Sequence, residues 1–237
     1  MTHTTQVGPI PQWIKDLRAP GYKNVFELGI NPSVIYGTEH LCGDWSGELL
    51  VLAKDFAPSD IVEDVIRRGY ASDVAFRHND GDGRYGRTGL NTNRNLMQFL
   101  FGNSGNLSGE NSSTCGVLYG NACFFLKSGG VSDSLKDFSV GRPVFDGSMK
   151  VVDYVLSQMK NVKAVVCLGG DAKRMLWGNP MFASRDPLNL SRNVGSSIPL
   201  YHVPHPGARA STTSYEDHVN SWSFVKRDSG LNWIAIA

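Results

Sequence analysis

Four short apolar runs constrain the fold of this 237-residue chain more than any other feature. They are residues 48–53, 115–126, 163–168 and 198–203. Each has the length of a buried strand. The segments between and after them carry helical patterns, at residues 61–68, 90–101, 148–159, 169–177 and 215–226. Strands that alternate with helices form a parallel sheet with helices on both faces. We therefore predict an α/β fold, a three-layer αβα sandwich with a central, mostly parallel four-stranded sheet.

We expect one domain over residues 1–237, because single α/β domains reach this length. Residues 1–45 are rich in Gly, Pro and aromatic side chains, which predicts a wrapping N-terminal arm with at most one short helix. Residues 77–89, 102–114, 127–145 and 178–197 are expected to be loops.

Composition excludes several protein classes. Hydrophobic residues make up 41% and charged residues 19%, which excludes global disorder. No apolar run approaches the roughly 20 residues of a membrane-spanning helix. The N-terminus lacks the pattern of a signal peptide, so we expect a cytoplasmic protein with no membrane partner, and a monomer. The net charge of +1 excludes a bulk polycation, although residues 160–192 hold six Lys/Arg against two acids.

The cysteines favour neither a metal site nor disulfides. Cys42, Cys115, Cys123 and Cys167 form no C-x-x-C pair, and Cys123 and Cys167 are expected to be buried small hydrophobes in strands. His78, Asp80 and Asp82 are close in sequence, but flexible Asp/Gly loops are common. We predict no metal and no cofactor.

Polar residues follow the predicted strands. In parallel sheets, functional residues collect on loops at the carboxyl ends of strands, which here follow Ala53, Asn121, Leu168 and Val203. After the first strand, Asp55 can orient or deprotonate a water, or instead cap the turn or pair with Lys54.

Asn121 and His205 each allow a functional and a structural interpretation. Asn121 stands in an apolar run, so its amide either reads an amide-like edge or closes a strand end by an internal hydrogen bond. His205 lies between Pro204 and Pro206, on a restricted turn. It can donate to a developing oxyanion or be a hydrogen-bonded structural residue.

Three further positions have both interpretations. Arg209 can contact a phosphate or enter a duplex, or be a solvated charge. Tyr85, between Arg84 and Arg87, can stack on a base while the arginines meet phosphates, or be a surface tyrosine. The glycines of Gly169-Gly170-Asp171 can expose N–H groups to an anion or simply permit close strand–helix packing. A Ser-His-Asp triad has no G-x-S-x-G elbow to support it.

The order of these motifs resembles that of the uracil-DNA glycosylase superfamily, over roughly residues 45–211. The matching segments are Leu49 to Pro58, Tyr85-Gly86-Arg87-Thr88-Gly89, Gly120-Asn121-Ala122-Cys123, Leu168-Gly169-Gly170-Asp171-Ala172 and His205-Pro206-Gly207-Ala208-Arg209. The first resembles the family's water-activating loop and the third its base-reading strand. The second, fourth and fifth are similar to "F-x-G-R-x-G", "L-G-x-x-A" and "H-P-S-x-x".

The resemblance implies a DNA glycosylase that flips a nucleotide into a pocket and breaks its N-glycosidic bond, without lyase activity. Its implied partner is single- or double-stranded DNA. Asp55 would position water and stabilise the sugar cation, and His205 would stabilise the leaving base. The implied base-binding residues are Lys54, Phe56, Tyr85 and Asn121. The implied DNA-binding residues are Arg87, Gly169, Gly170, Gly207, Arg209 and Ser211.

Departures from the family pattern bear on the substrate. The first motif usually reads "G-Q-D-P", "G-E-A-P" or "G-x-N-P", whereas here it is Ala53-Lys54-Asp55-Phe56-Ala57-Pro58. One register places Asp55 on the water-activating residue, and the other anchors on Ala57-Pro58 and leaves Phe56 at the polar position. We prefer the first, because Asp55 then follows the strand directly. The family's Ser after His-Pro is Gly207 here, and the clustered cysteines of its iron–sulfur branch are absent.

These departures leave a DNA glycosylase, with two possible substrate classes, and two alternatives to a glycosylase. The substrate is uracil or a modified pyrimidine. A bulkier base would suit an enzyme that removes hypermodified cytosine from phage DNA, since Gly207 and Ala57 are small. The alternatives are a non-catalytic nucleic-acid-binding protein on the same fold and an unrelated α/β hydrolase or nucleotide-binding protein.

Overall fold

The structure is a computed structural model. It describes residues 10–24, 27, 42–54, 59, 63, 95–96, 98–102, 116–127, 141–177, 182–185, 198–206 and 213–236. Within these ranges, no helix combines the length and apolar character that crossing a membrane requires.

A six-stranded sheet forms the centre of the molecule, in the order β2-β4-β3-β6-β8-β7. The strands are β2 (Cys42–Gly43), β3 (Leu49–Ala53), β4 (Val117–Asn121), β6 (Ala164–Leu168), β7 (Phe182–Arg185) and β8 (Ile198–Val203). Five of them run parallel, and β2 is antiparallel to β4. The α/β fold with a mostly parallel sheet is confirmed, and the four predicted strands are the inner four, with a further strand at each edge.

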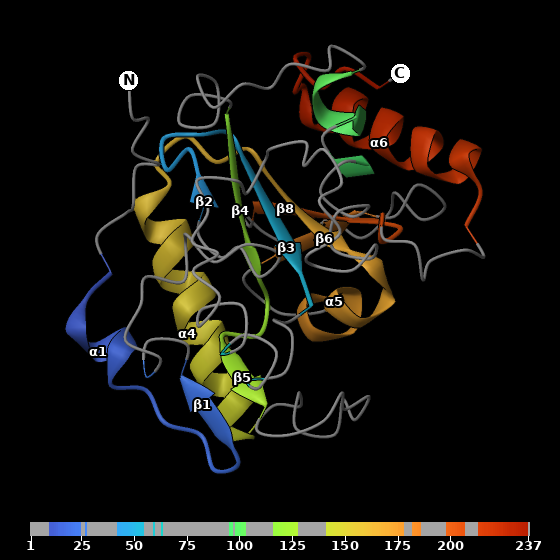
Figure 1. Cartoon of the computed structure of the whole chain (residues 1–237). Helices are drawn as coiled ribbons and strands as arrows, with labels where there is room; N and C mark the ends of the chain where they lie inside the picture. The colour runs from blue at the N-terminus through green and yellow to red at the C-terminus, as the bar shows by residue number, and fades with distance from the viewer. Residues whose placement is uncertain are drawn as a thin grey trace.

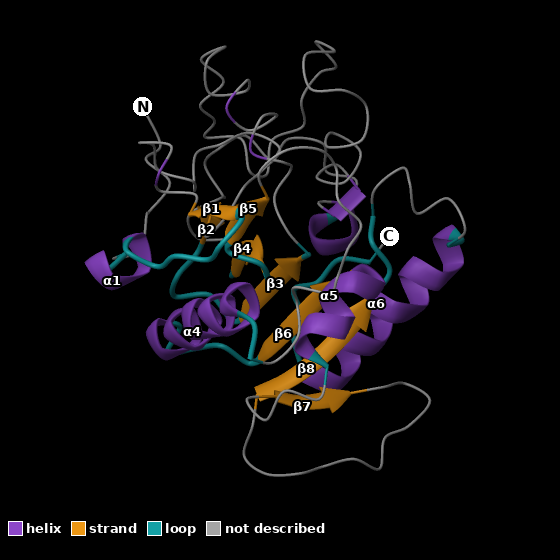
Figure 2. Cartoon of the chain, turned by 90° about the horizontal axis from the view of Figure 1, so that it is seen from below, coloured by secondary structure: helices purple, strands orange, loops and turns teal. Residues whose placement is uncertain are grey.

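Helices cover both faces of the sheet (Figures 1 and 2), which confirms the three-layer prediction. The helices α4 (Pro143–Gln158) and α5 (Gly169–Leu176) pack with Leu50 and Leu52 of β3. On the other face, α6 (Tyr215–Ser229) and the helical residues 95–96 and 98–101 pack with Leu49 and Val51. Side chains of a strand alternate between the faces, so β3 supplies both cores. All five of its residues are buried, as expected for a strand covered on both sides.

Helix α4 begins five residues before the predicted start at residue 148, within the predicted loop 127–145. Gly147 lowers the helix propensity of this segment, so the sequence pattern did not predict that the helix includes it. A Cβ atom on Gly147 would lie 2.9 Å from Phe125 Cε2, so the glycine lets α4 approach β5 (Phe125–Lys127) closely. Pro143 suits the first helical turn, because N–H groups there have no partner within the helix and the N–H that proline lacks is not needed.

Three short strands were not predicted. β7 lies in the predicted loop 178–197, and β1 (Tyr22–Asn24) and β2 lie in the predicted arm. The antiparallel pair of β1 and β5 forms a separate two-stranded sheet. Strands of two to four residues show no periodicity, and their pairing partners decide whether they form. The prediction of buried cysteines is confirmed for Cys123 and Cys167, both fully buried.

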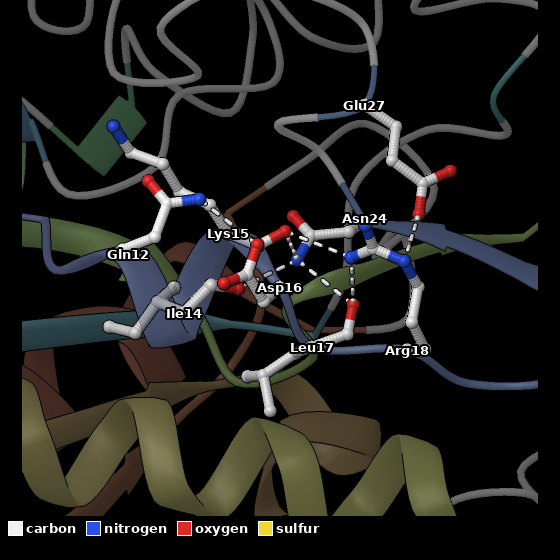
Figure 3. Close-up of polar contacts among 8 residues, drawn as sticks. All are labelled: Gln12, Ile14, Lys15, Asp16, Leu17, Arg18, Asn24 and Glu27. Atoms are coloured by element: carbon white, nitrogen blue, oxygen red, sulfur yellow. Dashed lines mark hydrogen bonds and ion pairs between the residues drawn. The ribbon is translucent and has the colours of Figure 1, made fainter.

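Asn24 is hydrogen-bonded to three backbone carbonyls of the N-terminal arm (Figure 3). Helix α1 (Gln12–Lys15) lies in the described part of this arm. The buried Asn24 amide Nδ2 donates to the carbonyl oxygens of Ile14 (2.7 Å), Leu17 (3.2 Å) and Lys15 (3.3 Å). Carbonyls at a helix C-terminus lack partners within the helix, and the Asn24 amide shares these acceptors with Leu17 N and Arg18 Nη1.

We expect the Asn24→Ala variant to lose about 1–3 kcal/mol of unfolding free energy, because the hydrogen bonds of a buried amide to three carbonyls are lost. Urea unfolding measures this loss. Asn161→Ala is the matched control, since Asn161 is exposed and its amide donates to Ser46 O. The control should change stability by less than about 0.5 kcal/mol. Equal losses in the two variants would contradict the role given to Asn24.

Candidate functional site

The register of the sheet brings four strand ends to one edge. Ala53 of β3 lies opposite Asn121 of β4, and Leu168 of β6 lies opposite Val203 of β8. The arrowheads of β3 and β8 point to this edge in Figure 2. Leu52 and Cys167, 115 residues apart in the sequence (167 − 52), therefore lie opposite each other on neighbouring strands. The described residues of this candidate site are Lys54, Asn121, Gly169, Gly170 and His205.

Lys54 follows β3 directly and is held in place by the next strand. Its carbonyl oxygen accepts a hydrogen bond from Cys123 N (2.8 Å), and the carbonyl of Ala53 accepts one from Ala122 N (2.7 Å). Its side chain is 21% exposed, and Nζ lies 3.5 Å from Asp171 Oδ2 in the first turn of α5. The site thus contains a partly buried lysine side chain with an acidic neighbour.

Asn121 is the last residue of β4, so the strand ends there, whereas the apolar run in the sequence continues to residue 126. After Asn121 the chain leaves the ladder, and Phe125 to Lys127 join β1 instead. Pairing with β1 breaks the apolar run into two strands, which its composition does not reveal. The Asn121 residue is 4% exposed. A ligand that reaches its amide must therefore enter below the protein surface.

Gly169 allows β8 and α5 to meet. Its φ of +81° lies in the left-handed region, and a Cβ atom there would stand 2.9 Å from His205 Cβ. A Cβ on Gly170 would meet nothing within 4 Å. The packing interpretation of the glycine pair therefore holds for Gly169 alone. Both glycines lie at the N-terminus of α5, where backbone N–H groups favour an anion.

His205 is a partly buried imidazole with a lowered pKa. Burial has the largest effect on this pKa, His218 lowers it further, and Asp171 opposes both. The neutral form, which has one N–H donor and one acceptor, is therefore favoured at neutral pH. Asn95 Nδ2 donates to the carbonyl of Pro206 (2.8 Å), which fixes the turn after His205.

His218 was missed by the sequence analysis. This buried residue of α6 stacks on Phe99, with 5.0 Å between ring centroids and 14° between ring planes. Its Nδ1 is buried and has no hydrogen-bond partner among the described residues. Burial lowers its pKa, and Asp217 opposes this effect. A lone histidine in a polar helix carries no signal in the sequence, because only the packing of α6 brings it toward His205.

The other predicted site residues lie outside the described residues. They are Asp55, Phe56, Tyr85, Arg87, Gly207, Arg209 and Ser211. The acidic loop with His78, Asp80 and Asp82 also lies outside them. Among the residues that are described, no three His, Cys, Asp or Glu side chains are grouped so as to hold a metal ion.

The described part of the site can bind and stabilise a polar, electron-rich group. It offers an ammonium, a buried amide, an imidazole and the N-terminus of a helix at one sheet edge. No protein-family model matches the chain, and no curated protein matches it either. The chemistry must therefore be argued from these residues.

We expect Gly169→Ala to destabilise the protein by about 1–3 kcal/mol, because alanine is strained at positive φ. Its Cβ would also displace His205, which NMR of the imidazole signals would detect. Gly170→Ala, one residue later and facing open space, is the matched control. It should leave the His205 signals in place and the stability nearly unchanged. A Gly169→Ala protein with native stability and unshifted signals would contradict the close contact.

The two histidines predict a pH dependence of stability. Both have folded-state pKa values below their ordinary 6.5, so the unfolded chain binds more protons once the pH falls toward and below 6.5. The unfolding free energy should therefore fall as the pH drops from 6.5 toward the folded-state values. Glu48 and Asp217, whose pKa values are lowered from 4.5 and 3.8, lose their contributions only at lower pH.

Urea unfolding from about pH 8 to about pH 5 measures this dependence. His218→Phe should make the loss smaller and should raise the pKa of His205, because a group that lowers it is removed. A constant unfolding free energy over this range would contradict the burial of neutral imidazoles.

Proposed function

We propose that this protein is a DNA glycosylase, which flips a base out of DNA and hydrolyses its N-glycosidic bond to leave an abasic site. The substrate class is uracil or a modified pyrimidine. The observation that carries the proposal is the meeting of Lys54, Asn121, Gly169 and His205 at one sheet edge. These residues come from separate motifs whose order resembles that of the uracil-DNA glycosylase superfamily.

His205 suits the stabilisation of a departing base. As the N-glycosidic bond breaks, negative charge develops on an oxygen of the base. A neutral imidazole can donate its N–H to that oxygen without first losing a proton. The lowered pKa of His205 keeps this form populated at neutral pH, and Gly169 allows the imidazole to lie against the start of α5.

Asn121 suits the reading of a base edge. A primary amide presents a donor and an acceptor side by side, which matches the paired groups of a pyrimidine edge. The near-complete burial of Asn121 means that only a base removed from the stack could reach it. Base flipping provides such access, because it carries one nucleotide into an enclosed pocket.

Most of the remaining roles are assigned to residues outside the described ranges. Asp55, next to Lys54 in the chain, would position the attacking water, with Phe56 beside the base and Tyr85 stacked on it. The backbone N–H groups of Gly169 and Gly170 would bind phosphate. The other DNA-binding residues would be Arg87, Gly207, Arg209 and Ser211. Arg209 would also fill the gap left by the flipped base.

Lys54 favours a base other than plain uracil. Its side chain is 21% exposed and its ammonium pairs with Asp171, and Lys54 is next in the chain to the residue proposed to position water. A cation at this point adds a hydrogen-bond donor that the family's motif lacks. This supports the second candidate, an anti-phage defence enzyme that excises hypermodified cytosine, whose substituent would offer acceptors to such a donor.

A base-excision assay tests the proposal. Oligonucleotides would carry uracil, hypoxanthine, thymine opposite guanine, hydroxymethylcytosine or glucosylated cytosine, in single and double strands. We expect abasic sites on at least one substrate. The rate should fall by about 10²–10³-fold in His205→Phe, which removes the imidazole N–H donor to the leaving base. It should fall by about 10²–10⁴-fold in Asp55→Asn.

Thermal unfolding of each variant would show that it is folded. A folded wild-type protein that binds DNA but excises none of these bases would contradict the glycosylase and favour a nucleic-acid-binding protein. Turnover of a nucleotide or acyl substrate without DNA binding would favour an unrelated α/β hydrolase. A profile limited to uracil would contradict the defence role.

A further inference from the structure

The ion pair between Lys54 and Asp171 joins two parts of the candidate site, and none of the roles assigned above uses Asp171. Lys54 stands at the end of β3, and Asp171 lies in the first turn of α5. The distance from Lys54 Nζ to Asp171 Oδ2 is 3.5 Å, and the side chains are 21% and 44% exposed. The pair therefore spans from the proposed base pocket to the helix that carries the two glycines.

Lys54 has little freedom in its backbone. Its carbonyl oxygen is bonded to Cys123 N just past the end of β4. Its ammonium must therefore be directed by its side-chain surroundings. Asp171 provides a carboxylate oxygen 3.5 Å from Lys54 Nζ.

Asp171 acts on the other side of the site as well. Helix α5 starts at Gly169, whose α-carbon lies against His205. The Asp171 carboxylate raises the pKa of His205, against the effects of burial and of His218. One carboxylate is thus close enough to influence both the lysine after β3 and the histidine after β8.

We propose that Asp171 is a positioning residue that holds the Lys54 ammonium at the edge of the base pocket, facing the departing base. This inference rests on the proposed glycosylase function. The ammonium stabilises the negative charge that develops on the base, and its fixed orientation means that little reorganisation is needed during the reaction. Exclusion of water by a bound nucleotide strengthens both interactions.

A purely structural role explains the pair less well. Partly exposed ion pairs contribute little to stability in general. Asp171 also has a second cationic neighbour, Arg174, whose Nη1 lies 3.6 Å from Asp171 Oδ1 and whose side chain is 73% exposed. Arg174 comes from the same helix as Asp171, so it links no separate elements. It therefore supplies a matched control for Lys54.

The test is a double-mutant cycle on the full-length protein with the best substrate of the excision assay. Single-turnover rates would be measured for Asp171→Asn, Lys54→Met and the double variant. We expect each single change to slow excision by about 10- to 100-fold, with little change in DNA affinity. The double variant should be no slower than Lys54→Met alone, because Asp171 acts through Lys54. Asp171→Glu should recover part of the rate, and Arg174→Gln should retain it.

A second measurement does not depend on activity. NMR titration should show a lower pKa for His205 in Asp171→Asn than in the wild-type protein, since the carboxylate that raises it is gone. The acid limb of the excision rate should move to lower pH in the same variant, because His205 then stays neutral in more acidic solution. Arg174→Gln should change neither the pKa of His205 nor the acid limb of the excision rate.

The outcomes separate this inference from the function on which it rests. An active wild-type protein with an equally active Asp171→Asn variant would overturn the positioning role and leave the glycosylase intact. Additive losses of excision rate in the double variant would also overturn the positioning role. A folded wild-type protein that excises no base would overturn the proposed function, and the positioning role with it.

Discussion

The parallel register of the inner strands is the constraint on which the rest of this structure depends. Backbone pairing of β3 with β4 and of β6 with β8 aligns Ala53 with Asn121 and Leu168 with Val203. A shift of one residue in any strand would turn its side chains to the opposite face. The register is held by burial on both faces, since Leu50 and Leu52 belong to one core and Leu49 and Val51 to the other.

Close backbone approach is the second requirement of the site. The turn after β8 can reach α5 only because Gly169 has no side chain and adopts a positive φ. This contact buries the imidazole of His205, and burial lowers its pKa. The packing of the turn after β8 against α5 thus favours the neutral form of His205. Geometry and electrostatics at this edge have one common cause.

Much of the architecture was predictable because the inner strands are long, apolar and bounded by polar segments. The predicted range 198–203 is that of β8, and those of β3 and β6 differ by one residue at their starts. The predictions were less accurate where tertiary contacts override local pattern. The run 115–126 is split at Asn121 by pairing of Phe125 with β1, and Gly147 lies inside α4 because Phe125 packs against it.

The sequence by itself determined the fold class and the motif order, because apolar periodicity and turn composition are local properties of the chain. It also marked Asn121 and His205 as polar residues in unusual surroundings. Only the tertiary structure decided which side chains meet. The pairing of Lys54 with Asp171 joins residues far apart in the sequence, and the influence of His218 on His205 arises from the packing of α6. Such contacts depend on how strands and helices pack, and no local pattern records them.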